Sequence, residues 1–170
     1  MSKTLQKEVD PILCASQERK ISGELSYNEL TRLKEIIEPS SQPITADLEF
    51  SRIGKFVVVT GRISASLVLQ CVACLEALDF QVEIDVKLAI INSESLLNQL
   101  PDNYEPCLLE GDHLLISELV ESEVVLVLPD VPRHNVCPID LPKSSSSKDF
   151  ALQMEEKKNP FDVLESLKKH

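Results

Sequence analysis

The fold class is set by one stretch of the sequence, residues 80–88, which read FQVEIDVKL. Apolar and polar residues alternate through it, which is the pattern of a β-strand with one buried face and one face in water. The same alternation marks residues 44–51, and β-branched residues are frequent in residues 56–60 and 63–70. The spacers between these segments are shorter than the roughly twelve residues that a parallel crossover needs. The sequence therefore predicts an antiparallel β-meander over residues 44–92.

Two helices are expected to pack on this sheet. Residues 27–38 carry apolar side chains at helical spacing, follow a capping box formed by Ser26 and Glu29, and end before a proline. A second buried helix is predicted to begin at Ser117, its N-cap, and to end at Pro129. Its valines leave a strand as an alternative for its second half.

Shorter signals complete the predicted fold. Residues 9–13 could form a short strand, and residues 107–110 resemble a strand that leads into a turn at Gly111. Residues 1–142 are therefore expected to form a single α+β domain, an antiparallel sheet packed with two or three helices.

The C-terminal part of the chain is expected to lie outside this domain. Residues 143–158 are polar and serine-rich, and they contain too little apolar surface to pack, which predicts a flexible linker. Residues 159–170 carry the local signals of a short helix, but one too short to be stable alone. That helix needs a surface to dock on, and the long linker favours a partner's groove over the protein's own sheet. The predicted partner-binding anchors are Phe161, Leu164 and Leu167.

The charge of the chain is uneven. The 170 residues have a net charge of −11, and residues 66–142 contain fourteen acidic but only two basic side chains. Binding to nucleic acid draws most of its nonspecific affinity from Lys and Arg contacts to phosphate, so this segment would repel a phosphate backbone. It is either a solvated acidic surface that maintains solubility or a docking face for a basic protein, and composition alone favours the first.

The location of the protein is expected to be the cytoplasm. No apolar run approaches the roughly twenty residues of a membrane span, and the first residues lack the apolar core of a signal peptide. The five cysteines are an odd number, which argues against a disulfide framework and favours a reducing compartment.

Cys71 and Cys74 form the one motif with clear chemical potential. Two thiolates at this spacing, at the tip of a predicted hairpin, can face the same tetrahedral zinc ion, and His134 and Cys137 are the nearest candidates for the other two ligands. A redox dithiol is a second interpretation, but the strand-to-helix context that it needs is missing. A pair of half-buried thiols at a turn is the third.

Motifs typical of enzymes are missing from the sequence. Its four glycines do not form a phosphate-binding loop, and there is neither a nucleophile elbow nor a His-Glu-x-x-His motif. The residues alone therefore indicate a non-enzymatic adaptor with a possible metal knuckle.

Four ordered motifs resemble the bacterial YceD family, called the large ribosomal RNA subunit accumulation protein. They are residues 71–75 (CVACL), 100–106 (LPDNYEP), 116–132 with its closing LPDVP, and 159–164 (NPFDVL). The resemblance implies a cytosolic protein needed for synthesis, processing or stability of large-subunit ribosomal RNA, with no assigned catalytic residues. The family's Cys-x-x-Cys and downstream cysteine region map onto Cys71, Cys74 and Cys137. Only one cysteine follows Pro132 here, so a fourth ligand would have to be His134.

The acidic charge and this resemblance together predict how the protein acts. We expect a basic protein partner, either a ribosomal protein or an rRNA-processing factor, with ribosomal RNA contacted at most indirectly. One alternative is a direct RNA-binding protein with a structural zinc knuckle that uses Arg52, Lys55 and Arg62. The least favoured alternative is an enzyme that processes RNA.

Overall fold

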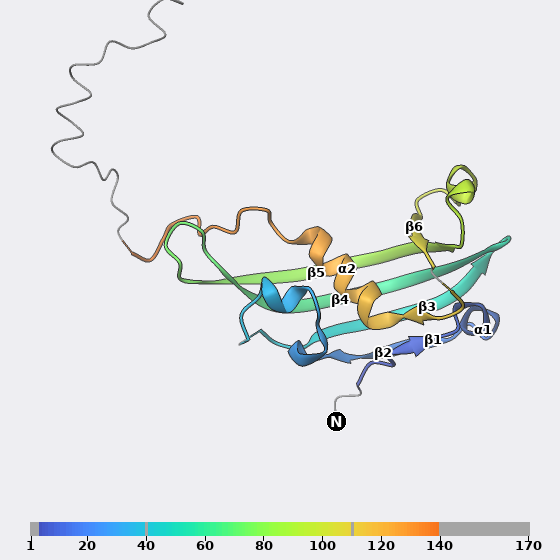
Figure 1. Ribbon diagram of the computed structural model, residues 1–170, viewed down its shortest axis with the longest axis horizontal. Helices are drawn as coiled ribbons and strands as arrows, with labels where there is room; N and C mark the ends of the chain where they lie inside the picture. The colour runs from blue at the N-terminus through green and yellow to red at the C-terminus, as the bar shows by residue number, and fades with distance from the viewer. Residues whose placement is uncertain (1–3, 40, 110, 140–170) are drawn as a thin grey trace, which may run out of the picture. The chain divides into compact units, whose positions relative to one another are not determined.

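The predicted meander forms the centre of the sheet. In the computed structural model, which describes residues 4–39, 41–109 and 111–139, strands β3 (Ile44–Ile53), β4 (Phe56–Gln70) and β5 (Ala77–Ile91) pair antiparallel in sequence order (Figure 1). Their alternation is as the sequence predicts, because one face of each strand is buried and the other is in water.

Two further strands complete a five-stranded sheet of order β2-β3-β4-β5-β6. Strand β2 (Lys20–Leu25) pairs antiparallel with β3, and β6 (Glu105–Leu108) pairs parallel with β5 after the 3-10 helix η3 (Glu94–Gln99). The α+β prediction is confirmed as a mostly antiparallel sheet with few helices. The parallel pairing of β6 was not predicted.

The main core lies on one face of this sheet. Helices α1 (Pro11–Ser16) and α2 (Ile116–Val127) bury side chains against it, and the short strands β1 (Glu8–Val9) and β7 (Leu114–Leu115) pair antiparallel beside α2. The residues that the two helices bury are Pro11, Cys14, Ala15, Ile116, Leu119, Val120, Glu121 and Val124.

The opposite face of the sheet is left uncovered over most of its length by the described part of the chain. Only at one end does an apolar cluster of Phe56, Val58, Ala89 and Ile91 lie under the segment that includes η3. The rest of that face presents the polar residues of the alternating pattern, such as Thr45, Arg62 and Asp85.

The predicted helix over residues 27–38 is wrong. That segment forms two separate 3-10 helices, η1 (Tyr27–Glu29) and η2 (Leu33–Glu35), with Leu30 extended between them. Its capping box is present, because the Ser26 amide donates to the Glu29 carboxylate at 3.0 Å. The helix is interrupted because the Glu121 carboxylate of α2 accepts hydrogen bonds from the amides that begin η2.

Helix α2 is confirmed, but its predicted start is wrong. Leu115, not Ser117, is the N-cap, and the Ile116 amide donates to the Lys7 carbonyl at 2.9 Å. A backbone carbonyl of the N-terminal segment thus satisfies the first amide of the helix. The second half of α2 is helical, so the strand alternative for its valines is also wrong.

Gly61 lies inside the continuous strand β4, between the segments 56–60 and 63–70 that the sequence indicates as separate. A Cβ atom at this position would lie 2.0 Å from the Asp47 carbonyl oxygen of the paired strand. Glycine therefore allows β3 and β4 to approach closely at this register position.

The predicted linker, residues 143–158, and the predicted terminal helix, residues 159–170, lie outside the described residues. The anchors Phe161, Leu164 and Leu167 therefore stay predictions, as does a domain boundary at residue 142. Among the described residues, no helix combines the length and the apolar character needed to cross a membrane.

Candidate metal centre

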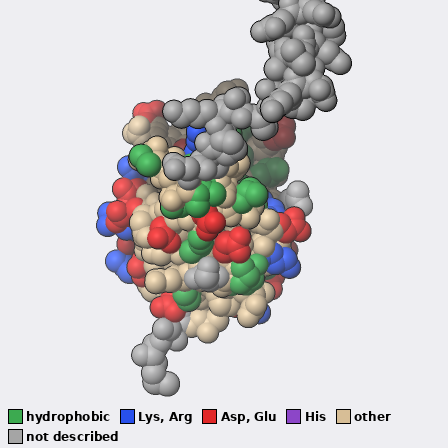
Figure 2. Space-filling model, turned by 90° about the vertical axis from the view of Figure 1, so that its left-hand side faces the viewer, with side chains coloured by type: hydrophobic (Ala, Val, Ile, Leu, Met, Phe, Trp, Pro, Cys, Tyr) green, Lys and Arg blue, Asp and Glu red, His purple; other side chains and the backbone are tan. Residues whose placement is uncertain are grey.

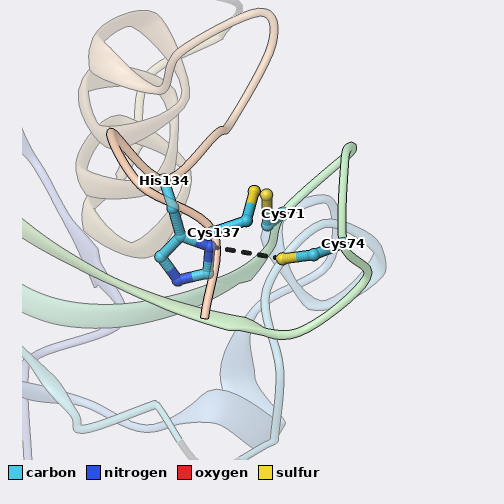
Figure 3. A group of neighbouring side chains, drawn as sticks. All are labelled: Cys71, Cys74, His134 and Cys137. Carbon is cyan, nitrogen blue, oxygen red and sulfur yellow. Dashed lines mark hydrogen bonds between the residues drawn. The ribbon is translucent and has the colours of Figure 1, made fainter. Parts of the chain in front are cut away.

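The loop between β4 and β5 presents two cysteines from a tight turn. The Cys71 amide donates to the Glu76 carbonyl at 2.9 Å, and the Leu75 amide donates back to the Cys71 carbonyl at 2.8 Å. Leu75 adopts a φ of +63°, a left-handed conformation that lets the chain reverse directly after Cys74. The turn brings the two sulfurs to the same side, as Figure 3 shows.

A second loop, which follows α2, is held against this turn. The Val72 amide donates to the Pro132 carbonyl at 2.9 Å, and the chain beyond Pro132 then passes beside the two cysteines with His134 and Cys137 (Figure 3). Residues separated by 60 positions in the sequence, Cys74 and His134, are thereby in contact.

The four predicted ligands lie close enough to share one ion. The sulfurs of Cys71, Cys74 and Cys137 and a ring nitrogen of His134 are all within 4.8 Å of one another, and Cys74 Sγ lies 3.4 Å from His134 Nδ1. Zinc bonds of about 2.3 Å to sulfur and about 2.1 Å to nitrogen put tetrahedral ligands about 3.5–3.8 Å apart. The cluster could therefore hold a zinc ion.

The orientation of the His134 ring is fixed by a hydrogen bond on the side that faces away from the sulfurs. Its Nε2 lies 3.1 Å from the Ala77 carbonyl oxygen, which can only accept a hydrogen bond, so Nε2 carries the proton. In the neutral ring Nδ1 is then free of a proton and faces the sulfurs, as in metal-bound histidines whose other nitrogen donates to a carbonyl.

The protonation states of the sulfurs are unequal. Burial disfavours the Cys71 thiolate, but the amides of His134, Cys74 and Ala73 donate to its sulfur and lower its pKa to about 5. The pKa of Cys137 is raised by burial and by the neighbouring sulfurs of Cys74 and Cys71. The backbone thus supplies hydrogen bonds to one sulfur, while the crowding of sulfurs opposes a second negative charge.

The cluster is closed toward the protein and bordered by apolar side chains toward solvent. Cys71 and Cys74 are buried, whereas His134 and Cys137 are half-buried. Exposed apolar side chains lie beside the ligands in both loops, namely Val72, Leu75, Val131 and Val136. Figure 2 shows this end of the molecule, where hydrophobic and acidic side chains lie next to one another.

All four sequence-predicted ligands are thus brought together, and the five described cysteines are free thiols. The Cys-x-x-Cys motif lies at a hairpin tip, not at the start of a helix, so the arrangement lacks the context of a redox dithiol. The Ala77 carbonyl that positions His134 could not be predicted, because a backbone oxygen leaves no signal in the sequence.

The three basic residues proposed for direct RNA contact do not form one patch. Arg62 lies between carboxylates, with Nε 3.2 Å from Asp85 and Nη1 3.5 Å from Glu83. Arg52 is paired with Val57, five residues along β4 from Arg62, which corresponds to about 17 Å of strand. Lys55 lies at the same end of the sheet as Arg52.

Comparison with known proteins gives one consistent result. A family model described as "Large ribosomal RNA subunit accumulation protein YceD" matches residues 59–168, a span that contains all four candidate ligands. The chain is 30% identical over 165 residues to the Large ribosomal RNA subunit accumulation protein YceD of Haemophilus influenzae, with 94% of each chain covered. No solved structure matches.

Proposed function

Because the chain belongs to the YceD family, we propose that it is a non-enzymatic cytoplasmic factor that supports synthesis, processing or stability of large-subunit ribosomal RNA through a basic protein partner. The family is described by the accumulation of this RNA, and its description names no catalysed reaction. The mode of action and the partner are our proposal.

The charge on the open face of the sheet carries the proposal of a protein partner. Arg62 lies between Glu83 and Asp85, and Lys20 lies 3.1 Å from Glu49, so these cations already face carboxylates. A phosphate backbone would have to displace those carboxylates and approach the remaining acidic residues. A basic protein would instead find complementary charge on this acidic chain.

We also propose that the cluster of Cys71, Cys74, His134 and Cys137 binds a structural zinc ion. Its four protein side chains would fill a tetrahedral coordination sphere and leave no position for a water or a substrate. Zinc there would join the β4–β5 loop to the loop after α2, and it would hold the exposed Val72 and Val131 in fixed positions. This role fits a binding factor better than an enzyme.

The tail belongs to the same proposal. The stripe of Phe161, Leu164 and Leu167 is expected to dock on the partner as a short helix. Truncation after Lys148 should then leave the melting temperature nearly unchanged and abolish co-purification of the partner. A fall of several degrees with binding intact would assign the tail to the core instead.

The test of the function is deletion of the gene and measurement of ribosomal subunits in sucrose gradients. We expect the ratio of large-subunit to small-subunit RNA to fall and precursor RNA to accumulate, and the intact gene in trans to restore both. Normal subunit ratios without precursor RNA would refute the proposed role.

A binding experiment separates a protein partner from direct RNA contact. The purified full chain is titrated with a large-subunit ribosomal RNA fragment across a salt series. An adaptor should show little affinity for RNA alone at any salt concentration. Tight binding that weakens steeply with salt would indicate direct phosphate contacts and contradict the proposed mode of action.

A further inference from the structure

A groove of about 670 Å³ lies between the edge strand β6 and helix α2, away from the metal cluster. Its floor is formed by buried Leu88, Leu114 and Leu119, and its walls by exposed leucines of both elements. Leu126 of α2 is 74% exposed and Leu108 of β6 is 50% exposed. Neighbouring apolar side chains around a hollow of this size are typical of a binding groove.

The charged residues of the groove are carboxylates. Glu118 and Glu123 of α2 line it, and Glu105 of β6 is near enough to act on Glu123. No Lys or Arg is among the described lining residues, and no ion pair of these three carboxylates occurs within the described part of the chain. Burial and the charge of Glu105 both raise the pKa of Glu123.

We infer that this groove binds a basic amphipathic segment of a protein, with apolar side chains against the leucines and Lys or Arg side chains on Glu118 and Glu123. The inference rests on the proposed function, because it gives the basic protein partner a place on the chain. Apolar anchors at helical spacing suit a groove between a helix and a strand edge.

Charge favours this occupant over a second copy of the chain and over RNA. A second copy of the chain would bring carboxylates onto carboxylates, because the same surface meets itself in a symmetric dimer. RNA would bring phosphates toward the same carboxylates. The pairing of β6 with β5 leaves one backbone edge of β6 open, but Pro106 lacks an amide donor, so an added strand is disfavoured.

The test uses the full chain and a defined probe. The probe is a peptide of about 18 residues, five helical turns, that contains only Leu and Lys with the leucines on one helix face. Binding is measured by fluorescence anisotropy, and the contacted residues are mapped by amide chemical shifts. The same composition in scrambled order and a Leu/Glu peptide of the same pattern serve as control probes.

Two pairs of variants make the test specific to the groove. Leu126→Glu places a charge in the groove, and Leu97→Glu places the same charge on η3 at an exposed leucine outside it. Glu123→Gln removes a groove carboxylate, and Glu94→Gln removes an exposed one on η3. None of these changes alters the buried core.

We expect saturable binding of the amphipathic Leu/Lys peptide only, with shifts confined to the residues that line the groove. Leu126→Glu should weaken binding about tenfold, as loss of an anchor does, and Leu97→Glu should leave it within about twofold. Glu123→Gln should weaken binding and flatten its salt dependence, whereas Glu94→Gln should do neither.

Several outcomes would overturn the inference: no binding, equal binding of the scrambled peptide, equal loss in Leu126→Glu and Leu97→Glu, or shifts on the open face of the sheet. A dimer of the free protein that Leu126→Glu dissociates would assign the groove to self-association. Loss of RNA-fragment binding in Leu126→Glu would assign it to RNA.

Failure of this inference is distinguishable from failure of the proposed function. If Leu126→Glu loses the peptide but restores ribosomal RNA fully in the deletion strain, the groove is not the partner site and the role stands. If deletion leaves ribosomal RNA normal, the role is refuted, and the peptide titration still decides what the groove binds.

Discussion

Removal of the metal from the cluster should destabilise the protein by an amount that the fold allows us to work out. A zinc ion would link Cys74 to His134, which are 60 positions apart in the chain. Treated as a cross-link, closure of a loop of that length removes chain entropy from the unfolded state worth about 4 kcal/mol at 25 °C. Since domains of this size are stable by about 5–15 kcal/mol, that is a large share of the total.

The assay compares metal content with unfolding. Protein purified without chelator should contain about one equivalent of zinc, and its urea midpoint should fall after dialysis against a chelator. Cys71→Ser should lose both the metal and the chelator response, because its sulfur is one of the four ligands. Cys107→Ser is the matched control, since Cys107 is a half-buried thiol outside the cluster and should keep both.

Two results would refute this reasoning. Metal analysis that gives well under a tenth of an equivalent would support a pair of metal-free thiols at a turn, the interpretation that needs no ion. A full equivalent of zinc whose removal leaves the urea midpoint unchanged would show that the ion closes no loop that matters for folding.

The remaining predictions concern stability and are read from urea or thermal unfolding. Glu121→Gln should lower the free energy of unfolding by about 2 kcal/mol at pH 7, because the four hydrogen bonds to the carboxylate would no longer be made to a charged group. The control Glu118→Gln on the same helix should change the free energy of unfolding by under about 0.5 kcal/mol. Burial opposes the Glu121 charge, but hydrogen bonds from Leu33, Thr31 and Arg32 lower the pKa of Glu121 on balance. The stabilisation by this carboxylate is therefore fully present above its unfolded-state pKa and is lost as the pH falls through its folded-state pKa. The Glu121→Gln protein should not show this loss of stability in acid. Gly61→Ala should lower the free energy of unfolding by about 3 kcal/mol, since the alanine Cβ would overlap the Asp47 carbonyl oxygen. An unchanged urea midpoint would contradict this close approach of the two strands. Leu75→Gly should keep the metal and raise the free energy of unfolding by about 1 kcal/mol, because glycine adopts the positive φ without strain. A lower urea midpoint would show that the exposed Leu75 side chain makes stabilising contacts within the protein.

The meander could be predicted from the sequence because its signal is local. Alternation over residues 80–88 identifies one strand and its buried face, and short spacers force antiparallel neighbours. The parallel pairing of β6 with β5 has no such signal, since Glu105–Leu108 is a short segment that contains a proline. The position of β6 in the sheet depends on the path of the chain through η3, and the packing of that segment on the sheet sets this path.

The error over residues 27–38 has a single physical cause. Spacing and capping in that segment satisfy the rules for a helix, and Leu30, Leu33 and Ile37 are indeed buried. What the local pattern cannot contain is the Glu121 carboxylate, about 90 positions away, which competes for the amides that the second helical turn would have used. An acidic residue among the apolar residues of a predicted buried helix is a sequence signal for such a contact, although it does not identify the residues that the carboxylate will bind.

The metal cluster could be predicted only in part. Cys71 and Cys74 are recognisable by spacing, and His134 and Cys137 are the nearest candidates because they stand at compatible spacing between prolines. Their approach across 60 positions depends on the path of the chain along β5, through β6 and α2, and back to the hairpin tip. No local pattern encodes that path.

Helix α2 lines the groove beside β6 and leads into the loop of the metal cluster. The composition of this helix gives no sign of the groove. As a sequence it reads as a buried helix, because nearly every non-acidic position is apolar. In the fold, Leu119, Val120 and Val124 do enter the core, but Leu126 is 74% exposed at the wall of the groove. A leucine that the core does not use lies next to carboxylates that form no ion pair within the described part of the chain. The composition of this surface is explained better by a partner than by folding. The same helix ends at Val127 and leads within a few residues to His134, so a metal that holds the following loop would also fix the end of the helix that lines the groove.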